Sequence, residues 1–294
     1  MKWSFGRTRR QRILLRLGLY GGTLLVGIPM AFAYVMTRPL RPKEPLLPPP
    51  PGFEELRLTS DGIRLRAWLS VGEKDRPAVV IAPGLGDSIE SYVGQAWPLR
   101  ERGHSVLLVD LRGQGGSEGS TTALGAREHA DVTAAMQALR RRGLAGNGII
   151  LEGYSMGAVA VLLAATRAPD VRAVIVEAPY DTYRHAIEHH AALLYHLPSW
   201  TPLIPIAIKL AEWRAGFRAD DADAVAAARR IHAPLLVIAD GEDPQMPEAM
   251  VRRVYDAHPG PKKFWLAPGA QHVSAAALDD YWPQVRGFLE ENGL

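Results

Sequence analysis

The chain has 294 residues, of which 47% are apolar and 22% are charged, so it can bury a core and is neither disordered nor fibrous. It contains no cysteine, which excludes disulfides, thiolate metal sites and a cysteine nucleophile. Its net charge of +3 is unevenly distributed: residues 1–43 hold nine basic and no acidic residues, whereas residues 44–294 hold 25 basic and 31 acidic residues, a net of −6. The acidic body argues against nucleic acid as a partner.

Residues 1–36 are predicted to form a basic cytoplasmic tail and a transmembrane helix. Twenty residues without a formal charge, 17–36, follow six basic residues and precede three more. As a helix they would reach about 30 Å, one hydrocarbon thickness. The positive charge before the span predicts a cytoplasmic N-terminus, a single pass and an extracytoplasmic body.

Two alternatives to a membrane anchor are open. Ala31-Phe32-Ala33 matches a signal-peptidase site, and cleavage there would release a secreted body. The long basic leader and the apolar run beyond Ala33 favour a retained anchor. A buried core helix is the other alternative, but such helices are rarely apolar on every face beside a basic run.

Residues 37–52 are predicted to be a proline-rich linker. They contain seven prolines, which favours polyproline II and no packed core. At about 3.1 Å per residue the segment would be a semi-rigid spacer of up to roughly 50 Å. Such a spacer would hold the following domain clear of the lipid surface.

Residues 53–294 show alternating strand and helix patterns. Period-two alternation in 56–58 and 63–69 predicts a β-hairpin with one solvent-facing side. Short continuous apolar runs are typical of parallel strands buried on both faces, and six follow: 78–82, 105–109, 148–151, 172–176, 234–239 and 263–266. Helical patterns lie between most of these runs, in 124–143, 155–168, 248–257 and 277–291. The alternation predicts one doubly wound α/β domain.

One interval, at about 180–232, lacks a strand pattern. Within it, residues 191–213 are apolar but interrupted by Pro198, Pro202 and Pro205, too often to span a bilayer. The interval is interpreted as a helical lid that covers an apolar site. A helical pair packed as ordinary core is the alternative.

A Gly-x-Ser-x-Gly motif, Gly153-Tyr154-Ser155-Met156-Gly157, lies between a predicted strand and a predicted helix. In that context the motif indicates a nucleophile elbow, a tight turn that exposes the serine hydroxyl. The backbone of the serine would be strained, and Gly153 and Gly157 would pass too close for side chains. The hydroxyl would lie at the positive end of the following helix. An ordinary glycine-rich turn is the alternative.

With this motif and four others, residues 53–294 resemble the serine hydrolases of the α/β-hydrolase superfamily, including esterases, lipases and serine aminopeptidases. Residues 82–86 are similar to the family's oxyanion turn, with Pro83 in place of the usual histidine. Residues 110–117 are similar to its Asp-x-Arg-Gly-x-Gly-x-Ser loop. The resemblance implies a mostly parallel, eight-stranded sheet with helices on both faces and a helical lid insertion.

The remaining two segments carry the family's acid and histidine. Asp243 begins an Asp-x-x-x-Pro segment after the seventh predicted strand, and His272 ends a Pro-Gly loop after the eighth. The resemblance implies that Ser155, Asp243 and His272 form the catalytic triad, in the chain order that this fold uses. It also implies an oxyanion hole made by the backbone N–H groups of Leu85 and Met156.

Three other carboxyl groups are alternatives to Asp243 as the acid. Three residues before Asp243 the family usually has a glycine, and this chain has Asp240. Asp240 and Glu242 are therefore alternatives for the acid, and Asp181 is a more distant one.

Two other motifs suggest different chemistry. His185, Glu188 and His189 match His-x-x-Glu-His, an inverted zinc-protease motif. Residues 113–119 are glycine-rich, but their spacing does not fit a dinucleotide-binding loop. Because neither motif explains the placement of Ser155, Asp243 and His272, we expect no metal and no organic cofactor.

The sequence therefore predicts a membrane-anchored serine hydrolase that cleaves carboxylic esters or related acyl bonds through an acyl-enzyme. The expected substrate is a small-molecule or lipid-like acyl compound. A small-peptide or amide hydrolase with the same triad is one alternative, and a non-catalytic hydrolase-like binding domain is another.

Overall fold

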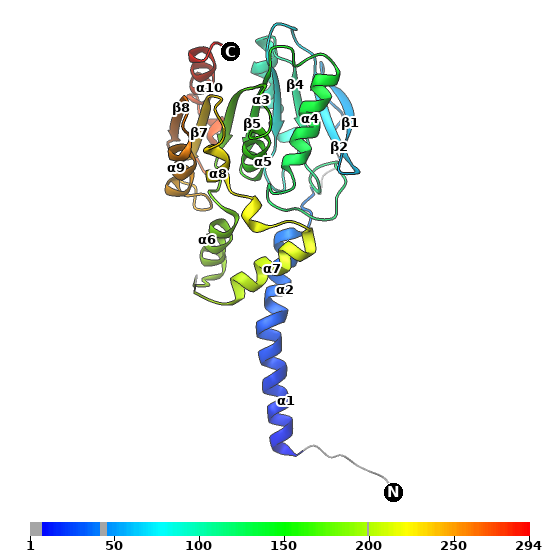
Figure 1. The fold of residues 1–294 in the computed structure, drawn as a ribbon, viewed down its shortest axis with the longest axis vertical. Coiled ribbons are helices and arrows are strands. Elements are labelled where there is room, and N and C mark those ends of the chain that lie inside the picture. The colour runs from blue at the N-terminus through cyan, green and yellow to red at the C-terminus, as the bar shows by residue number, and fades with distance from the viewer. Residues whose placement is uncertain (1–7, 42–45, 199) are drawn as a thin grey trace.

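A computed structural model describes residues 8–41, 46–198 and 200–294. A helical rod projects from an α/β domain (Figure 1), and it consists of α1 (Arg9–Gly22), a π-helical segment (Thr23–Gly27) and α2 (Ile28–Thr37). Three basic residues of the predicted N-terminal tail and linker, Lys2, Arg7 and Lys43, lie outside the described residues.

The domain is built on one eight-stranded sheet with the order β1-β2-β4-β3-β5-β6-β7-β8. β2 is antiparallel to both of its neighbours, and the other pairs are parallel. The predicted fold class is confirmed, and each of the six apolar runs is a strand. The strands are β1 (Glu54–Ser60), β2 (Ile63–Ser70), β3 (Ala78–Ala82), β4 (Val106–Val109), β5 (Ile149–Tyr154), β6 (Val171–Glu177), β7 (Leu235–Asp240) and β8 (Lys262–Ala267).

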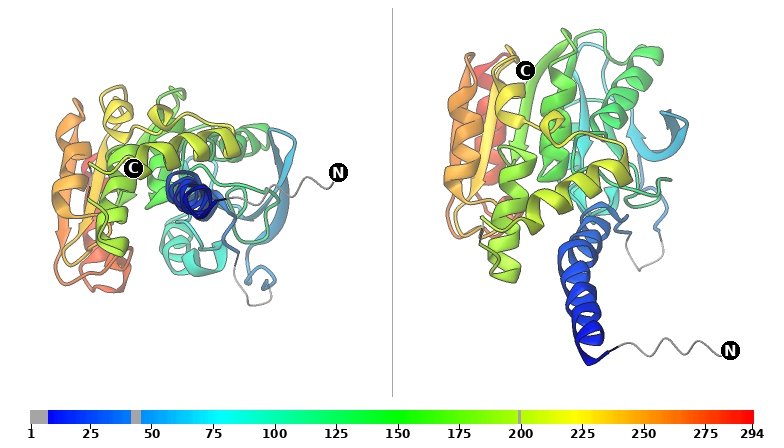
Figure 2. Two further views of the ribbon diagram at one scale, coloured as in Figure 1. Left: turned by 90° about the horizontal axis from the view of Figure 1, so that it is seen from below. Right: turned by 60° about the horizontal axis from the view of Figure 1, so that its bottom comes forward.

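Helices cover both faces of the sheet (Figure 2). One core cluster contains residues of α4 (His129–Arg141), α5 (Met156–Ala165), α8 (Ala224–Ala228) and α9 (Glu248–Ala257). The cluster on the other face contains residues of α3 (Val93–Glu101) and α10 (Tyr281–Glu291). Four of these helices agree with the helical patterns of the sequence, whereas α3 was not predicted.

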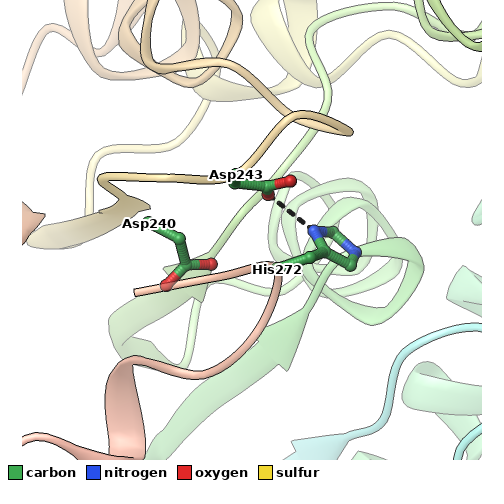
Figure 3. Close-up of side chains that lie close together, drawn as sticks. All are labelled: Asp240, Asp243 and His272. Carbon is green, nitrogen blue, oxygen red and sulfur yellow. Dashed lines mark hydrogen bonds and ion pairs between the residues drawn. The ribbon is translucent and has the colours of Figure 1, made fainter. Parts of the chain in front are cut away.

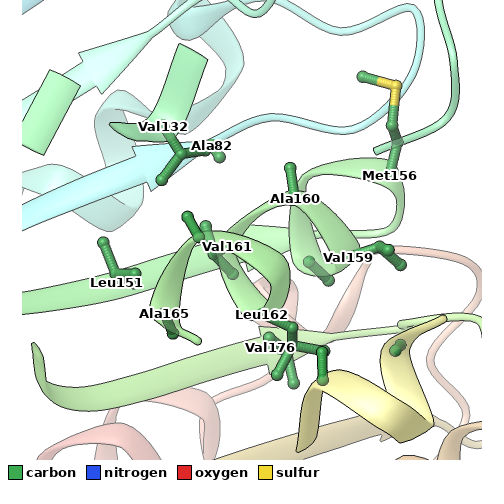
Figure 4. Packing of buried hydrophobic residues seen from close by; sticks show 14 of the residues in the cluster. Ala82, Val132, Leu151, Met156, Val159, Ala160, Val161, Leu162, Ala165 and Val176 are labelled. Atoms are coloured by element: carbon green, nitrogen blue, oxygen red, sulfur yellow. The ribbon is translucent and has the colours of Figure 1, made fainter. Parts of the chain in front are cut away.

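Helix α5 is buried on almost every side, because it lies between the sheet and the helices α4 and α8 (Figure 4). Nine of its ten residues are buried, and most are alanine or valine. Small side chains allow the helix to approach the strands closely. This packing fixes the first turn of α5, where Ser155 lies.

The solvent-facing side predicted for the first hairpin is present in β1 and absent from β2. β1 is an edge strand, but β2 lies between β1 and β4, and its residues from Leu65 to Ser70 are all buried. Arg66 is only 1% exposed and donates hydrogen bonds to Glu90 (2.7 Å) and to the carbonyl oxygen of Leu47 (2.5 Å). These partners offset the cost of burying the guanidinium.

The expectation that residues 37–52 hold the domain away from the membrane is wrong for the described part of that segment. Thr37 is fully buried, and its carbonyl oxygen accepts a hydrogen bond from the Thr122 amide (3.0 Å). Arg41 donates to the carbonyl oxygen of Gly119 (2.8 Å). Leu47 contacts Arg66 as described above. The linker therefore follows the surface of the domain.

The interval predicted as a lid forms a helical insertion, residues 180–232, between β6 and β7. It contains α6 (Tyr183–Tyr195), α7 (Leu203–Ala215) and α8. α7 packs against both α2 and α6. The insertion lies at the end of the domain from which the rod projects (Figure 1, Figure 2).

A buried ion pair connects the loop after β4 to α4. The guanidinium of Arg112 lies 2.6 Å from Asp131 Oδ1, and the Arg112 amide donates to Asp131 Oδ2 (2.8 Å). Both side chains are almost fully buried. The pair holds the loop that follows β4 in place at the end of the sheet.

We expect Asp131→Ala to lower the free energy of unfolding by about 3–5 kcal/mol, because it leaves the Arg112 charge buried without its main partner. The matched control is Asp170→Ala. Asp170 lies 2.5 Å from Arg140, but both side chains are about one-third exposed, so we expect a loss of at most about 1 kcal/mol. Denaturant unfolding of the full chain in detergent measures both. Equal losses would contradict the burial argument.

A buried carboxyl group, Glu152 of β5, makes the stability depend on pH. Burial raises its pKa to about 7, although hydrogen bonds from Tyr154 and Tyr281 favour the charged form. Between about pH 4.5 and 7 the folded chain therefore holds a proton at Glu152 that the unfolded chain has lost. Stability from this group is present at low pH and is lost as the pH rises through that interval.

We expect Glu152→Gln to remove this loss, which amounts to about 3 kcal/mol. The variant should therefore gain stability relative to the wild type as the pH rises from 4.5 to 7. Unfolding free energies of both proteins across that range test this. A difference between them that does not vary with pH would show that Glu152 is ionised in the folded chain.

Candidate active site

Ser155 lies between β5 and α5 with φ 50° and ψ −114°, a conformation that costs about 1–3 kcal/mol for a residue with a side chain. The flanking glycines make this turn possible. A Cβ atom on Gly153 would lie 2.5 Å from the Gly157 carbonyl oxygen, and one on Gly157 would lie 2.1 Å from the Ala82 carbonyl oxygen. The close approach expected from the sequence is present, so no side chain fits at either position.

The structure brings Ser155, His272 and Asp243 together. Ser155 Oγ lies 3.0 Å from His272 Nε2, and His272 Nδ1 lies 2.6 Å from Asp243 Oδ2 (Figure 3). The three residues follow β5, β8 and β7, respectively. Because these strands are parallel, their carboxyl ends lie at one edge of the sheet.

Asp243 is held in the charged form by its hydrogen bonds. Burial disfavours its charge, but the hydrogen bond from His272 and the amides of Gln245 (2.7 Å) and Met246 (3.1 Å) outweigh burial, so the pKa of Asp243 lies below its usual value. An ionised Asp243 keeps the proton of the neutral imidazole on Nδ1. His272 Nε2 is then free to accept the Ser155 proton.

The alternative acids do not contact His272. Asp240 Oδ2 accepts a hydrogen bond from the Val273 amide (2.8 Å), and Glu242 accepts one from Gln271 (3.0 Å). Figure 3 shows Asp240 near Asp243 but without an interaction with the imidazole. Asp181 pairs instead with His185 (2.7 Å) and Arg253 (2.9 Å).

Two buried carboxyl groups support the segment that carries His272. Asp240 holds the amide of Val273, whose φ of 54° is strained for a β-branched residue, and Glu177 accepts a hydrogen bond from the Ala275 amide (3.0 Å). Burial raises the pKa of Asp240 to about 6 and that of Glu177 well above its usual value, and the nearby charge of Asp240 raises the pKa of Glu177 further. The sequence analysis named Asp240 only as an alternative acid, and it did not predict this supporting role for either carboxyl group.

The loop after β3 faces the serine. A Cβ atom on Gly84 would lie 3.6 Å from Ser155 Cβ. The loop is fixed by the Gly86 amide, which donates to Gln114 Oε1 (2.7 Å), and by Asp87, which accepts from the Tyr92 hydroxyl (2.8 Å). Within the described residues, no hydrogen bond uses the amide of Leu85 or that of Met156, the first residue of α5. Both N–H groups are available to a ligand.

Ser155 and His272 line a cavity of about 620 Å³, within the range of about 300–1,000 Å³ that ligand pockets occupy. The helical insertion supplies one side of the cavity. The other side includes residues of α2, which the sequence did not predict, because nothing in a uniformly apolar helix indicates which face meets the domain. The α2 residues are Pro29, Phe32, Val35 and Met36.

Two groups of side chains contain potential metal ligands: the group of Asp240, Asp243 and His272, and the His-x-x-Glu-His motif. Asp240, Asp243 and His272 each place one ligand atom within 4.8 Å of the others, and Asp243 and His272 are hydrogen-bonded to each other. In the His-x-x-Glu-His motif, His185 bonds to Asp181 and His189 to the carbonyl oxygen of Pro244 (2.7 Å). The two histidines are not brought together in any metal-sized cluster of the described residues.

Comparisons with known proteins agree with this architecture. Residues 73–214 match the family model described as serine aminopeptidase, S33. The chain is 30% identical over 229 residues to the uncharacterized protein YqkD of Bacillus subtilis, covering 75% of this chain and 73% of that protein. It is 27% identical over 252 residues to the uncharacterized membrane protein YNL320W of Saccharomyces cerevisiae, covering 82% of this chain and 81% of that protein.

Among solved structures, an esterase of Pyrococcus furiosus superposes with a TM-score of 0.69 at 20% identity, covering 89% of this chain and 99% of that one. At this identity the likeness concerns the fold. Together with the sequence relatives and the arrangement at the carboxyl edge of the sheet, it establishes that the chain belongs to the α/β-hydrolase superfamily.

Proposed function

We propose that the protein is a membrane-anchored serine hydrolase that cleaves carboxylic esters or related acyl bonds. One observation carries the proposal: Ser155, His272 and Asp243 form a continuous chain of hydrogen bonds whose serine end opens into a largely apolar cavity. A hydroxyl, a base and an orienting carboxylate at these distances are what nucleophilic acyl transfer needs.

In the proposed reaction, Ser155 Oγ attacks the acyl carbon while His272 Nε2 takes the hydroxyl proton. Asp243 stabilises the imidazolium that forms and keeps the ring oriented. The imidazolium then donates its proton to the leaving alkoxide, which departs as the alcohol and leaves an acyl-Ser155 ester. Water, deprotonated by His272, attacks that ester; the acyl–Oγ bond breaks, the imidazolium returns the proton to Ser155 Oγ, and the carboxylic acid leaves.

The amides of Leu85 and Met156 are the proposed donors to the oxyanion. Met156 follows Ser155 in the chain and lies at the positive end of α5. Leu85 lies in the loop after β3, which faces the serine. One such donor contributes about 10²–10³ to the rate. Gln114 would act as a positioning residue, because it holds the Gly86 amide and with it the turn that presents Leu85.

Amide hydrolysis is the second candidate, favoured by the match to the serine aminopeptidase model. The triad is the same in both cases, so the distinction lies in the cavity. Its lining is mainly aliphatic and aromatic, which favours an acyl chain over the charged amino terminus of a peptide. Comparing p-nitrophenyl acyl esters with aminoacyl p-nitroanilides on the same preparation distinguishes the two.

Membrane anchoring belongs to the same proposal. Within the described residues, the 29-residue helix Arg9–Thr37 is the one that is long and apolar enough to cross a membrane. The basic residues before it favour a cytoplasmic N-terminus and an extracytoplasmic domain. Ala33 and Thr37 are buried against the domain, so cleavage after Ala33 would remove packing that the fold uses. This supports a retained anchor over a cleaved signal.

We expect Ser155→Ala to lower kcat for p-nitrophenyl ester hydrolysis by about 10⁴–10⁶-fold, because no other group replaces the attacking oxygen. The control is Ser70→Ala, which removes a serine hydroxyl at the opposite end of the sheet and should leave kcat unchanged. Unaltered turnover by Ser155→Ala would refute the nucleophile assignment. Loss of activity with a chelator would instead indicate metal-dependent hydrolysis.

We expect Asp243→Asn to lower kcat by about 10⁴-fold, because the amide cannot stabilise the imidazolium and favours the wrong tautomer. Glu242→Gln is the matched control one residue away and should retain wild-type kcat, since Glu242 contacts Gln271 and not the imidazole. If Asp243→Asn stays active while Glu242→Gln or Asp240→Asn abolishes turnover, the acid has been misassigned.

A further inference from the structure

The rod is too short to cross a bilayer without bringing the domain into contact with it. Arg16 is the last basic residue of the N-terminal run, and the domain begins to contact the rod at Ile28, since α1 has no buried residue whereas Pro29 and Ala33 are buried. The intervening residues, 17–27, reach only about 17 Å at 1.5 Å per residue. A hydrocarbon core is about 30 Å thick. The remaining thickness must lie alongside α2 and whatever packs against it.

The helical insertion packs there, at a depth that the structure defines. The rings of Phe32 in α2 and Tyr195 in α6 meet edge to face with centroids 4.7 Å apart. Phe32 lies sixteen residues beyond Arg16, or about 24 Å along the helix axis. The Arg16 side chain can also extend back to the inner interface, in which case Arg12 marks the inner boundary of the hydrocarbon. The distance along the helix axis from Arg12 to Phe32 is about 30 Å. In either case Tyr195 lies at the outer hydrocarbon boundary or within it.

The insertion has the surface that such a position requires. Its tip, defined here as Leu193, Leu194, Tyr195 and Trp200, is exposed, and Trp200 is 82% exposed. Residues 189–208 contain no Asp, Glu, Lys or Arg. An exposed apolar patch with tyrosine and tryptophan is typical of a surface that rests in a membrane interface. Figure 1 shows that the insertion and the rod lie at the same end of the molecule.

The cavity connects this surface to Ser155. Its lining includes Leu194 and Tyr195 of the tip, Phe32 and Met36 of the rod, and Ser155 itself. A chain that leaves the outer leaflet beside α2 therefore meets apolar side chains along its path to the serine. The rod is both an anchor and one wall of the cavity.

We propose that the insertion tip rests in the outer leaflet of the bilayer and that the cavity takes the acyl chain of a bilayer lipid ester directly from the membrane. The substrate class rests on the proposed hydrolase activity, whereas the position of the tip rests only on the proposed membrane anchor. The substrate would be a long-chain acyl ester whose carbonyl reaches Ser155 while its chain lies between α2, α6 and α7. Hydrolysis would return a fatty acid to the leaflet.

The position of the tip is tested without any activity. Because the chain has no cysteine, Trp200→Cys and Val71→Cys each accept a single nitroxide label in the full chain, reconstituted in phosphatidylcholine nanodiscs. Val71 is an exposed apolar residue that follows β2, at the end of the sheet opposite the site. We expect the label at position 200 to be accessible to oxygen and shielded from a nickel chelate, and the label at position 71 to behave in the opposite way. Equal accessibility to the nickel chelate at both positions would overturn the proposed placement.

The role of the rod as a cavity wall is tested by Met36→Trp, which fills the cavity, with Leu25→Trp as a control on the exposed part of the same helix. In nanodiscs we expect Met36→Trp to lower kcat/KM for p-nitrophenyl palmitate at least about tenfold more than kcat/KM for p-nitrophenyl acetate. Leu25→Trp should change neither rate. Equal effects of Met36→Trp on both esters, or none, would overturn the acyl-chain assignment while leaving Ser155-dependent hydrolysis intact.

Absence of any ester hydrolysis by the wild type would instead refute the proposed function, and with it the substrate class.

Discussion

The close packing of α5 against the strand ends is the constraint on which the site depends. Gly157 passes so near to the Ala82 carbonyl oxygen that no side chain fits, and Ser155 in the same turn has a strained φ of 50°. The strain persists because α5 is buried along almost its whole length, so relaxing the turn would expose apolar surface. The hydroxyl therefore has a fixed position, and the loops after β7 and β8 need only bring Asp243 and His272 to it.

At this edge of the sheet, two buried acids lower the stability of the fold but hold the backbone of the site in place. Asp240 and Glu177 are buried carboxyl groups whose raised pKa values reflect the cost of placing two acids side by side away from water. Their oxygens accept the amides of Val273 and Ala275, in the segment that follows His272. The chain thus keeps an unfavourable pair of acids in a place where they fix the backbone that orients the imidazole. A hydrophobic pair could not accept these two amides.

The sequence predicted the parts of the structure that leave a local pattern. Strands such as β3 and β7 are continuous apolar runs because both of their faces are buried, and the turn at Ser155 is visible because only glycine fits beside it. Helix α3 was missed because it contains Pro98 and has no clear apolar stripe. The burial of Arg66 and the docking of α2 on α7 depend on contacts between distant segments, which a local pattern does not encode. Likewise, Asp240 differs from an ordinary strand-end carboxylate only in what surrounds it.

Because α2 packs against the domain and lines the cavity, the proposed anchor would do more than hold the domain at the membrane. In the proposed function, a tether on a flexible spacer would only raise the local concentration of the hydrolase near lipid, whereas a helix that lines the cavity would connect the membrane to Ser155. The central claim, that Ser155 is an activated nucleophile, is tested most directly by treating the full chain with a fluorophosphonate and mapping the adduct by tandem mass spectrometry. The account predicts a single adduct in the tryptic peptide 143–167, where Ser155 is the only serine. No adduct, or an adduct elsewhere in the chain, would contradict it.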